Sequence, residues 1–268
     1  MAQDIKDTVE SHTGLLDRWM TQYNAMTTRI RARKVRPPTP AERFARAMET
    51  AQGVIERNPR GLPSLLRALL RPLQSRYLLG VAELGQDAYP PIGSPHFFGS
   101  AVHAYLWERG EFRGERRDPS GYLMRLNRDT VLPWPWSESS YEKNLAMIGS
   151  EKQVPVPDGS VRRYDGGPWV QHANHRVELW LPWGIGFVSS GNHSIAAGIL
   201  AGEGELVPDD VRDLSYVLDE VRFDGERYVD IKRDRPLGPA PDWSIGAAFE
   251  VGRLMVEHGV PSPIALMP

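Results

Sequence analysis

Cysteine is absent from the 268 residues of this chain, which excludes disulfide bonds, thiolate metal sites and thiol chemistry. Long apolar runs are absent too, since no window approaches the roughly 18 apolar residues that a helix needs to cross a bilayer. The N-terminal stretch, MAQDIKDTVESHTG, has no basic segment followed by an apolar one, as a secretory leader would. These absences predict a cytoplasmic protein with no membrane partner.

The residues that are present have the composition of a folded protein. Hydrophobic residues make up 41% of the chain and charged residues 25%, and 23 prolines with 25 glycines indicate many connections between short elements. A chain of this length can bury one sizeable core, or one core with an appended helical region.

The charge is distributed unevenly along the chain. The formal net charge is -2, yet residues 29–76 contain eleven arginines and one lysine against three glutamates. Such a basic segment is a candidate to bind DNA phosphates or an acidic protein partner, although a solvated helical face explains it equally well. The candidate binding residues come from its densest part, RIRARKVR, and are Arg29, Arg31, Arg33, Lys34 and Arg36.

Periodicity and helix breakers divide the chain near residue 85. Amphipathic spacing predicts helices over 5–26, 40–55 and 63–79, and Pro72 should kink or divide the third. We therefore expect a basic helical N-terminal region at 1–85 and an α/β domain at 86–268.

Elements of both kinds follow in the second region, so mixed α/β (α+β) is the expected fold class. Apolar periodicity, caps and breakers predict helices over 97–108, 138–148, 209–221 and 244–258. Short apolar or alternating runs predict strands over 122–126, 169–181, 184–188 and 227–232.

The stretch WGIGFVSSGNHSIAAGIL, at 183–200, is the strongest functional candidate because a strand passes through a glycine-containing turn into a helix. Backbone N–H groups converge on an anion at such a helix N-terminus, and the helix dipole helps to bind it. Gly191 would allow close approach, and Asn192, His193 and Ser194 would supply side-chain donors. An ordinary turn with Ser190 or Asn192 as N-cap is the alternative.

The run GFVSSGNHSIAAGIL resembles the strand–turn–helix signature of the ParB/sulfiredoxin superfamily, in which a glycine-led motif opens a helix and holds nucleotide phosphates. It is also similar to a GNHS-type motif of bacterial relatives of that superfamily. The preceding segment, LNRDTVLPWPWSESSYEKNLAMIG, resembles the opening of ParB-like domains. The resemblance covers 126–206 and implies a ParB/sulfiredoxin-like domain with an N-terminal helical extension.

The superfamily includes partition proteins that use CTP, sulfiredoxin, nucleases, and the fertility-inhibition proteins by which one conjugative plasmid suppresses transfer of another. For that last group the resemblance implies ATP hydrolysis and DNA cleavage. Gly191 and His193 match the motif position by position, whereas Asn192 occupies a variable place. Many relatives have arginine where this chain has Ser194, and a serine cannot neutralise charge. Arg176 is the nearest candidate to do so.

Arg176 belongs to the cluster WVQHANHRVELWLPW, whose alternation as a strand would place it on one face with Glu178. The two side chains would form an ion pair, or they would serve as a phosphate clamp and a general base. His175 would lie on the apolar face, where a hydrogen-bonded buried histidine is the simpler interpretation.

Two further clusters admit alternatives. His172, His175 and His193 suggest an HNH-like metal nuclease, but the odd spacing of the first two places them on opposite faces of a strand, so we assign no metal ligands. Tryptophans near the turn would stack on a base or pack inside, and we expect at least two of the four to be packed. They are Trp134, Trp136, Trp180 and Trp183.

The sequence thus favours a nucleotide-binding protein that takes ATP or CTP with Mg²⁺. In this interpretation Gly191, Asn192, His193 and Ser194 hold phosphates, Arg176 offsets charge, and Glu178 or His193 orients the attacking water. The resemblance extends this to an ATPase and DNase that inhibits conjugative transfer of a competing plasmid. One alternative is a non-catalytic interaction protein acting through its basic helical region, and another is the HNH-like metal-dependent nuclease.

Overall fold

A computed structural model of the chain describes residues 20, 36–87, 89–91, 93–108, 111–152, 154–155, 161–162 and 167–266. The chain forms two compact units, Met1–Thr39 and Pro40–Pro268. The expected helix over 5–26, apart from the helical Met20, lies outside the described residues, as do Arg29, Arg31, Arg33 and Lys34. Arg36 is described and exposed.

A mixed five-stranded sheet forms the centre of the second unit. Its order is β3 (Glu115–Arg116), β11 (Asp210–Asp213), β8 (Arg176–Leu181), β9 (Ile185–Ser190) and β5 (Thr130–Leu132). The central β8 and β9 pair antiparallel, whereas β11 runs parallel to β8 and β5 runs parallel to β9. The mixed α/β class predicted from the sequence is therefore confirmed.

Side chains alternate between the two faces of this sheet, and both faces carry buried apolar residues. Trp180, Ile185 and Phe187 lie in one hydrophobic cluster, and Val177 and Leu179 lie in another. A strand that is covered on both sides carries apolar residues at successive positions, which is the pattern of VELWL in β8.

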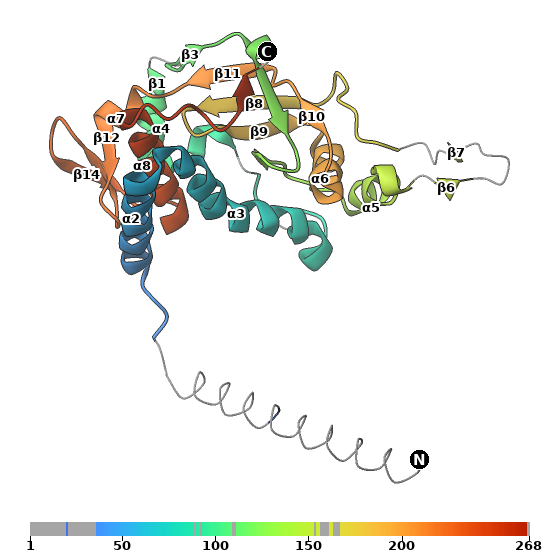
Figure 1. Ribbon diagram of the computed structural model, residues 1–268, viewed down its shortest axis with the longest axis horizontal. Coiled ribbons are helices and arrows are strands. Elements are labelled where there is room, and N and C mark those ends of the chain that lie inside the picture. Colours follow the sequence, from blue (N-terminus) through green and yellow to red (C-terminus); the bar gives the residue numbers. More distant parts are fainter. Residues whose placement is uncertain are drawn as a thin grey trace, which may run out of the picture. The chain divides into compact units, whose positions relative to one another are not determined.

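Helices α2 (Pro40–Arg57), α3 (Leu62–Leu84) and α8 (Trp243–Glu257) pack together against the first cluster (Figure 1). Pro72 lies inside α3 and does not end it. The helix continues to Leu84, beyond the predicted residue 79. The predicted division at residue 85 falls within the second unit, because α2 and α3 pack against α8 from the other side of that boundary.

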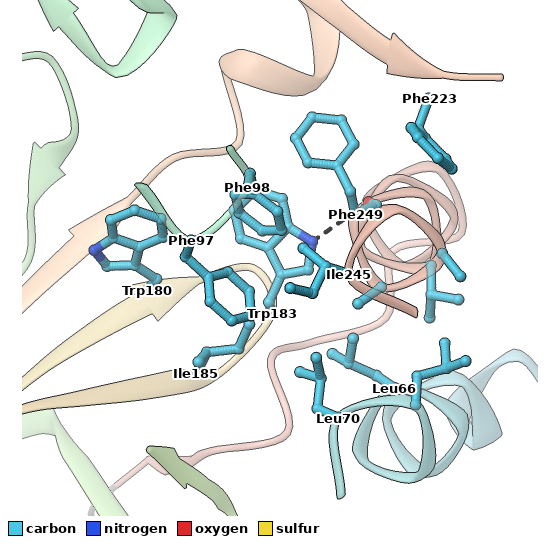
Figure 2. Close-up of a cluster of buried hydrophobic side chains, with 14 of the residues drawn as sticks. Leu66, Leu70, Phe97, Phe98, Trp180, Trp183, Ile185, Phe223, Ile245 and Phe249 are labelled. Carbon is cyan, nitrogen blue, oxygen red and sulfur yellow. Dashed lines mark hydrogen bonds between the residues drawn. The ribbon is translucent and has the colours of Figure 1, made fainter. Parts of the chain in front are cut away.

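Aromatic side chains join α8 to the sheet (Figure 2). Trp183 follows β8 and donates its indole N–H to the carbonyl oxygen of Phe249 in α8, at 3.3 Å. Phe98 packs between the two, with ring centroids 4.7 Å from Trp183 and 5.0 Å from Phe249. Leu66 and Leu70 of α3 belong to the same cluster.

The second cluster lies under α5 (Glu138–Met147) and α6 (Asn192–Ala201). It also includes residues of β4 (Tyr122–Arg125) and β10 (Glu205–Leu206), which pair antiparallel in a three-stranded sheet with β15 (Ala265–Leu266). The predicted strand over 122–126 and helix over 138–148 correspond to β4 and α5.

The predicted helix over 209–221 is wrong. Residues 210–213 form β11 beside β8, and only α7 (Val217–Glu220) is helical. The Asp209 carboxylate accepts the Val177 N–H at the start of this pairing, so it serves the strand and not a helix terminus. Val211 is fully buried, and this tertiary contact outweighs the local helical pattern.

The remaining elements are short. The helix expected over 97–108 is shorter, because α4 spans Ser100–Leu106 and is followed by β1 (Trp107–Glu108), which pairs with β2 (Glu111–Phe112). The short η2 (Ser94–His96) precedes α4. Strands β12 (Val221–Phe223), β13 (Tyr228–Asp230) and β14 (Arg235–Gly238) form a separate sheet. The other elements are η1 (Pro59–Gly61), η3 (Pro119–Gly121), η4 (Ser150–Lys152), β6 (Val154–Pro155) and β7 (Val161–Arg162). None of the helices in the described ranges has the length and apolarity that crossing a bilayer requires.

Candidate functional site

The predicted strand–turn–helix is present between β9 and α6. Gly191 follows β9 with φ 79°, in the left-handed region, and α6 begins at Asn192. A Cβ on Gly191 would lie 2.4 Å from His175 Cδ2 and 3.1 Å from the Asn174 carbonyl oxygen. Both the backbone conformation and the neighbouring side chain therefore require glycine here.

The N-terminus of α6 lacks a side-chain cap. Gly191 is the N-cap residue and no side chain of a described residue accepts from the first turn, so the expectation that Ser190 or Asn192 caps this helix is wrong. The Asn192 side chain points elsewhere, since its Oδ1 accepts the Trp134 N–H at 2.6 Å. The first N–H groups of an α-helix have no intrahelical acceptors, so this turn retains the donors that an anion requires.

His193 connects the turn to the loop that precedes α5. Its Nε2 accepts the Ser137 N–H at 3.0 Å, and its ring meets Trp136 edge to face with centroids 5.4 Å apart. Burial lowers the pKa of His193, which favours the neutral imidazole that this hydrogen bond needs. Since the lone pair of Nε2 is occupied, His193 positions the loop and is poorly placed to remove a proton from water.

A cavity of about 390 Å³, which we name the Trp136 pocket, lies beside the turn. Asn192, the first residue of α6, is part of its wall. Its other lining residues include Pro91, Ser94, Trp134, Trp136, Glu178 and Ser189. The structure thus brings one phosphate-site candidate, Asn192, to the same pocket as the candidate base Glu178.

Glu178 is half-buried in this pocket and held by two donors. Ser94 donates its hydroxyl to Oε2 at 3.2 Å, and the Trp180 indole N–H donates to Oε1. Arg176 is exposed at the start of β8, where the register shifts between Arg176 and Val177. The predicted ion pair between Arg176 and Glu178 does not form, although both residues are among those described.

A second cavity, of about 510 Å³, lies beside Ser194. Ser194 of α6 lines it together with Trp169, His172 and His175. Residues 172–175 form a turn and not a strand, so the His172 N–H reaches His175 Nδ1 at 3.0 Å. Of the predicted phosphate-binding residues, Asn192 lines the Trp136 pocket and Ser194 lines this second cavity, whereas Arg176, Gly191 and His193 line neither.

His175 is buried and hydrogen-bonded, as expected. It stacks on Trp169 with ring centroids 4.9 Å apart, and burial, followed by the neighbouring His172, lowers its pKa. His193 contacts Trp136 and does not join this pair. In the part of the chain that the structure describes, no group of three histidine, aspartate or glutamate side chains is arranged to hold a metal ion.

The four tryptophans divide as expected into packed and accessible residues. Trp180 and Trp183 are buried, Trp134 donates its indole N–H to the Tyr89 carbonyl oxygen at 2.7 Å, and Trp136 is 42% exposed. Ser94 and Ser189 also line the Trp136 pocket, and neither is among the residues predicted from the sequence. Ser189 lies two residues after Phe187 in β9 and so on the same face of the sheet, and continuing the predicted strand beyond residue 188 was the available signal.

Comparison with known proteins identifies one family. Residues 29–262 match DUF6710, a family of unknown function. No curated protein and no solved structure matches the chain.

Proposed function

The chain belongs to the DUF6710 family, and we propose that it binds a nucleotide, ATP or CTP with Mg²⁺, at the N-terminus of α6. The observation that carries this proposal is the uncapped first turn of a ten-residue helix whose first residue lines a tryptophan-walled pocket. In the proposal the domain retains the ParB/sulfiredoxin-like arrangement that its sequence motif resembles.

The phosphates are placed at the first turn of α6. The N–H groups of Asn192, His193 and Ser194 are the helix-terminal donors, and the positive end of the helix dipole lies there. Arg176, exposed at the adjoining end of β8, is the cation proposed to offset charge. Ser189 adds a hydroxyl on the pocket wall.

The nucleobase of the proposed ligand is placed against Trp136. A volume of about 390 Å³ lies in the range of pockets that hold small ligands. Stacking of a base on an aromatic side chain contributes about 1–3 kcal/mol and tolerates different bases. Trp136 has an accessible ring for such stacking, whereas Trp134 is fixed by its hydrogen bond to Tyr89.

Glu178 is the proposed general base for hydrolysis. Its carboxylate is oriented by Ser94 and Trp180 on the wall of the same pocket, so it can accept a proton from a water aligned with the terminal phosphorus. Glu178 is favoured over His193 because His193 Nε2 already accepts the Ser137 N–H. DNA cleavage and inhibition of conjugative transfer rest on the family resemblance.

Calorimetric titration with ATP, CTP and GTP, each with and without Mg²⁺, tests the binding step. Trp136→Ala should weaken binding by about 1–3 kcal/mol through lost stacking. Glu178→Gln keeps an acceptor for Trp180, so it should preserve binding while abolishing turnover. Leu200→Ala is the matched control, since Leu200 is 51% exposed near the C-terminal end of the same helix.

The result that would overturn the proposal is the absence of saturable binding by the folded protein to every nucleotide. That outcome would favour the non-catalytic alternative, in which Arg36 and the basic residues before it engage DNA or an acidic protein partner. Binding that Trp136→Ala and Leu200→Ala leave equally strong would place the nucleotide elsewhere.

A further inference from the structure

A cationic pocket lies apart from α6, between α4 and the turn that joins β13 to β14. It has a volume of about 380 Å³, and we name it the Lys232 pocket. Its walls come from five elements or their flanks. Its lining residues include Tyr105, Trp107, Arg113, Glu220, Asp230 and Lys232. None of its lining residues lines the Trp136 pocket.

Both carboxylates of the pocket are already neutralised. Glu220 receives two hydrogen bonds from the Arg113 guanidinium, at 3.0 and 3.2 Å. Asp230 is buried, and its Oδ2 accepts from Arg233 at 2.8 Å and from the Tyr105 hydroxyl at 2.8 Å. Arg233 and then Tyr105 hold the pKa of Asp230 well below its usual range, so it stays ionised and paired.

Positive charge remains once these pairs are formed. Lys232 lies in the tight turn between Asp230 and Arg233, where it is exposed and forms no ion pair with a described residue. Arg235 approaches Asp230 to 3.8 Å and adds a second cation beside the pair. The turn is fixed, because Asp230 Oδ1 also accepts the Arg233 N–H at 2.9 Å.

The lining of the pocket also includes a donor without an acceptor. Trp107 lines the pocket, and its buried indole N–H has no hydrogen-bond partner in the described part of the chain. A buried donor left in this state destabilises the folded protein. A small movement of this side chain toward a ligand oxygen would remove that cost.

We propose that the Lys232 pocket binds the phosphate or carboxylate group of a small anionic ligand. Lys232 supplies the charge that remains beside these ion pairs, and Trp107 supplies an indole donor from the lining of the same pocket. The ligand is independent of the nucleotide proposed at α6, since the two pockets share no residue.

Nuclear magnetic resonance of the ¹⁵N-labelled indole groups tests the site in the full chain. The chain has eight tryptophans, and Trp107→Phe identifies the Trp107 signal by its loss. Inorganic phosphate, pyrophosphate and citrate are titrated at low ionic strength, with sodium chloride at matched ionic strength as the reference. We expect a saturable shift of the Trp107 signal with at least one of the three anions, and the anions that produce it identify phosphate or carboxylate as the preferred group.

Lys232→Gln should raise the dissociation constant about tenfold or more, as expected for loss of a charge-assisted hydrogen bond. Lys143→Gln, an exposed lysine of α5, is the matched control and should leave it unchanged. Trp136→Ala should also leave the Trp107 shift unchanged, which separates this site from the nucleotide site. An unmoved Trp107 signal, a shift that sodium chloride reproduces, or equal affinity of the Lys232→Gln protein would each overturn the proposal.

Discussion

Gly252 lies where α8 packs on Trp183, and Gly252→Ala should destabilise the protein by about 3 kcal/mol. A Cβ on Gly252 would lie 2.1 Å from Trp183 Nε1 and 2.5 Å from its Cδ1, far inside van der Waals contact. Trp183 is 1% exposed and contacts both Phe98 and Phe249, so its ring has little space into which to move (Figure 2).

Three contributions give this magnitude. Overpacking a core costs about 1–3 kcal/mol, and a clash with a rigid buried ring belongs at the upper end. Displacing the indole weakens its hydrogen bond to the Phe249 carbonyl oxygen by about 1 kcal/mol. Alanine has a higher helix propensity than glycine, which returns about 1 kcal/mol. The net loss should lower the melting temperature by roughly 6–12 °C in a domain of this size.

Urea unfolding followed by circular dichroism measures this loss. Gly53→Ala in α2 is the matched control, because its Cβ would meet only the flexible end of Arg57, at 3.2 Å. That change should stabilise the protein by about 0.5–1 kcal/mol through helix propensity. If the Gly252→Ala protein were as stable as the wild type, the described packing of α8 on Trp183 would be refuted.

Three further changes test other parts of the structure. Asp129→Ala removes the fully buried carboxylate that pairs with Arg128, and it should lower the free energy of unfolding in urea by about 3 kcal/mol. The isosteric Asp129→Asn should lower it less. Gln74→Met leaves the Val131 carbonyl oxygen without its donor and should cost about 1–2 kcal/mol; no loss would contradict that bond. Burial lowers the pKa of His193, so the unfolded state binds its proton more readily and stability falls as the pH drops below about 6.5. His193→Gln should reduce this loss, and an unchanged pH profile would exclude His193 as a source.

The strand–turn–helix at 185–201 could be predicted because all its signals are local. An apolar run, a glycine and a run of small residues follow one another, and the structure forms β9, the left-handed Gly191 and α6 in that order. Glycine is required at position 191 for a second reason that no local pattern contains, because a Cβ there would clash with His175. Only the fold brings these two positions together.

Where long-range contacts decide the structure, prediction failed. The segment 209–221 has a helical pattern, but parallel pairing with β8 makes its first part a strand. Alternation along a strand separates His172 from His175, yet a turn brings them into a hydrogen bond. The Trp136 pocket joins Ser94, Trp136 and Glu178, which are distant in the sequence, so its composition required the fold.

The central claim is that nucleotide phosphates bind at the first turn of α6, and the backbone amide signals of that turn test it most directly. In a titration with ATP or CTP and Mg²⁺, followed by nuclear magnetic resonance, the signals of Asn192, His193 and Ser194 should move downfield and saturate together. The signal of Gly202, the C-cap of the same helix, should stay in place. Saturable nucleotide binding that leaves the three amide signals unmoved would contradict the claim.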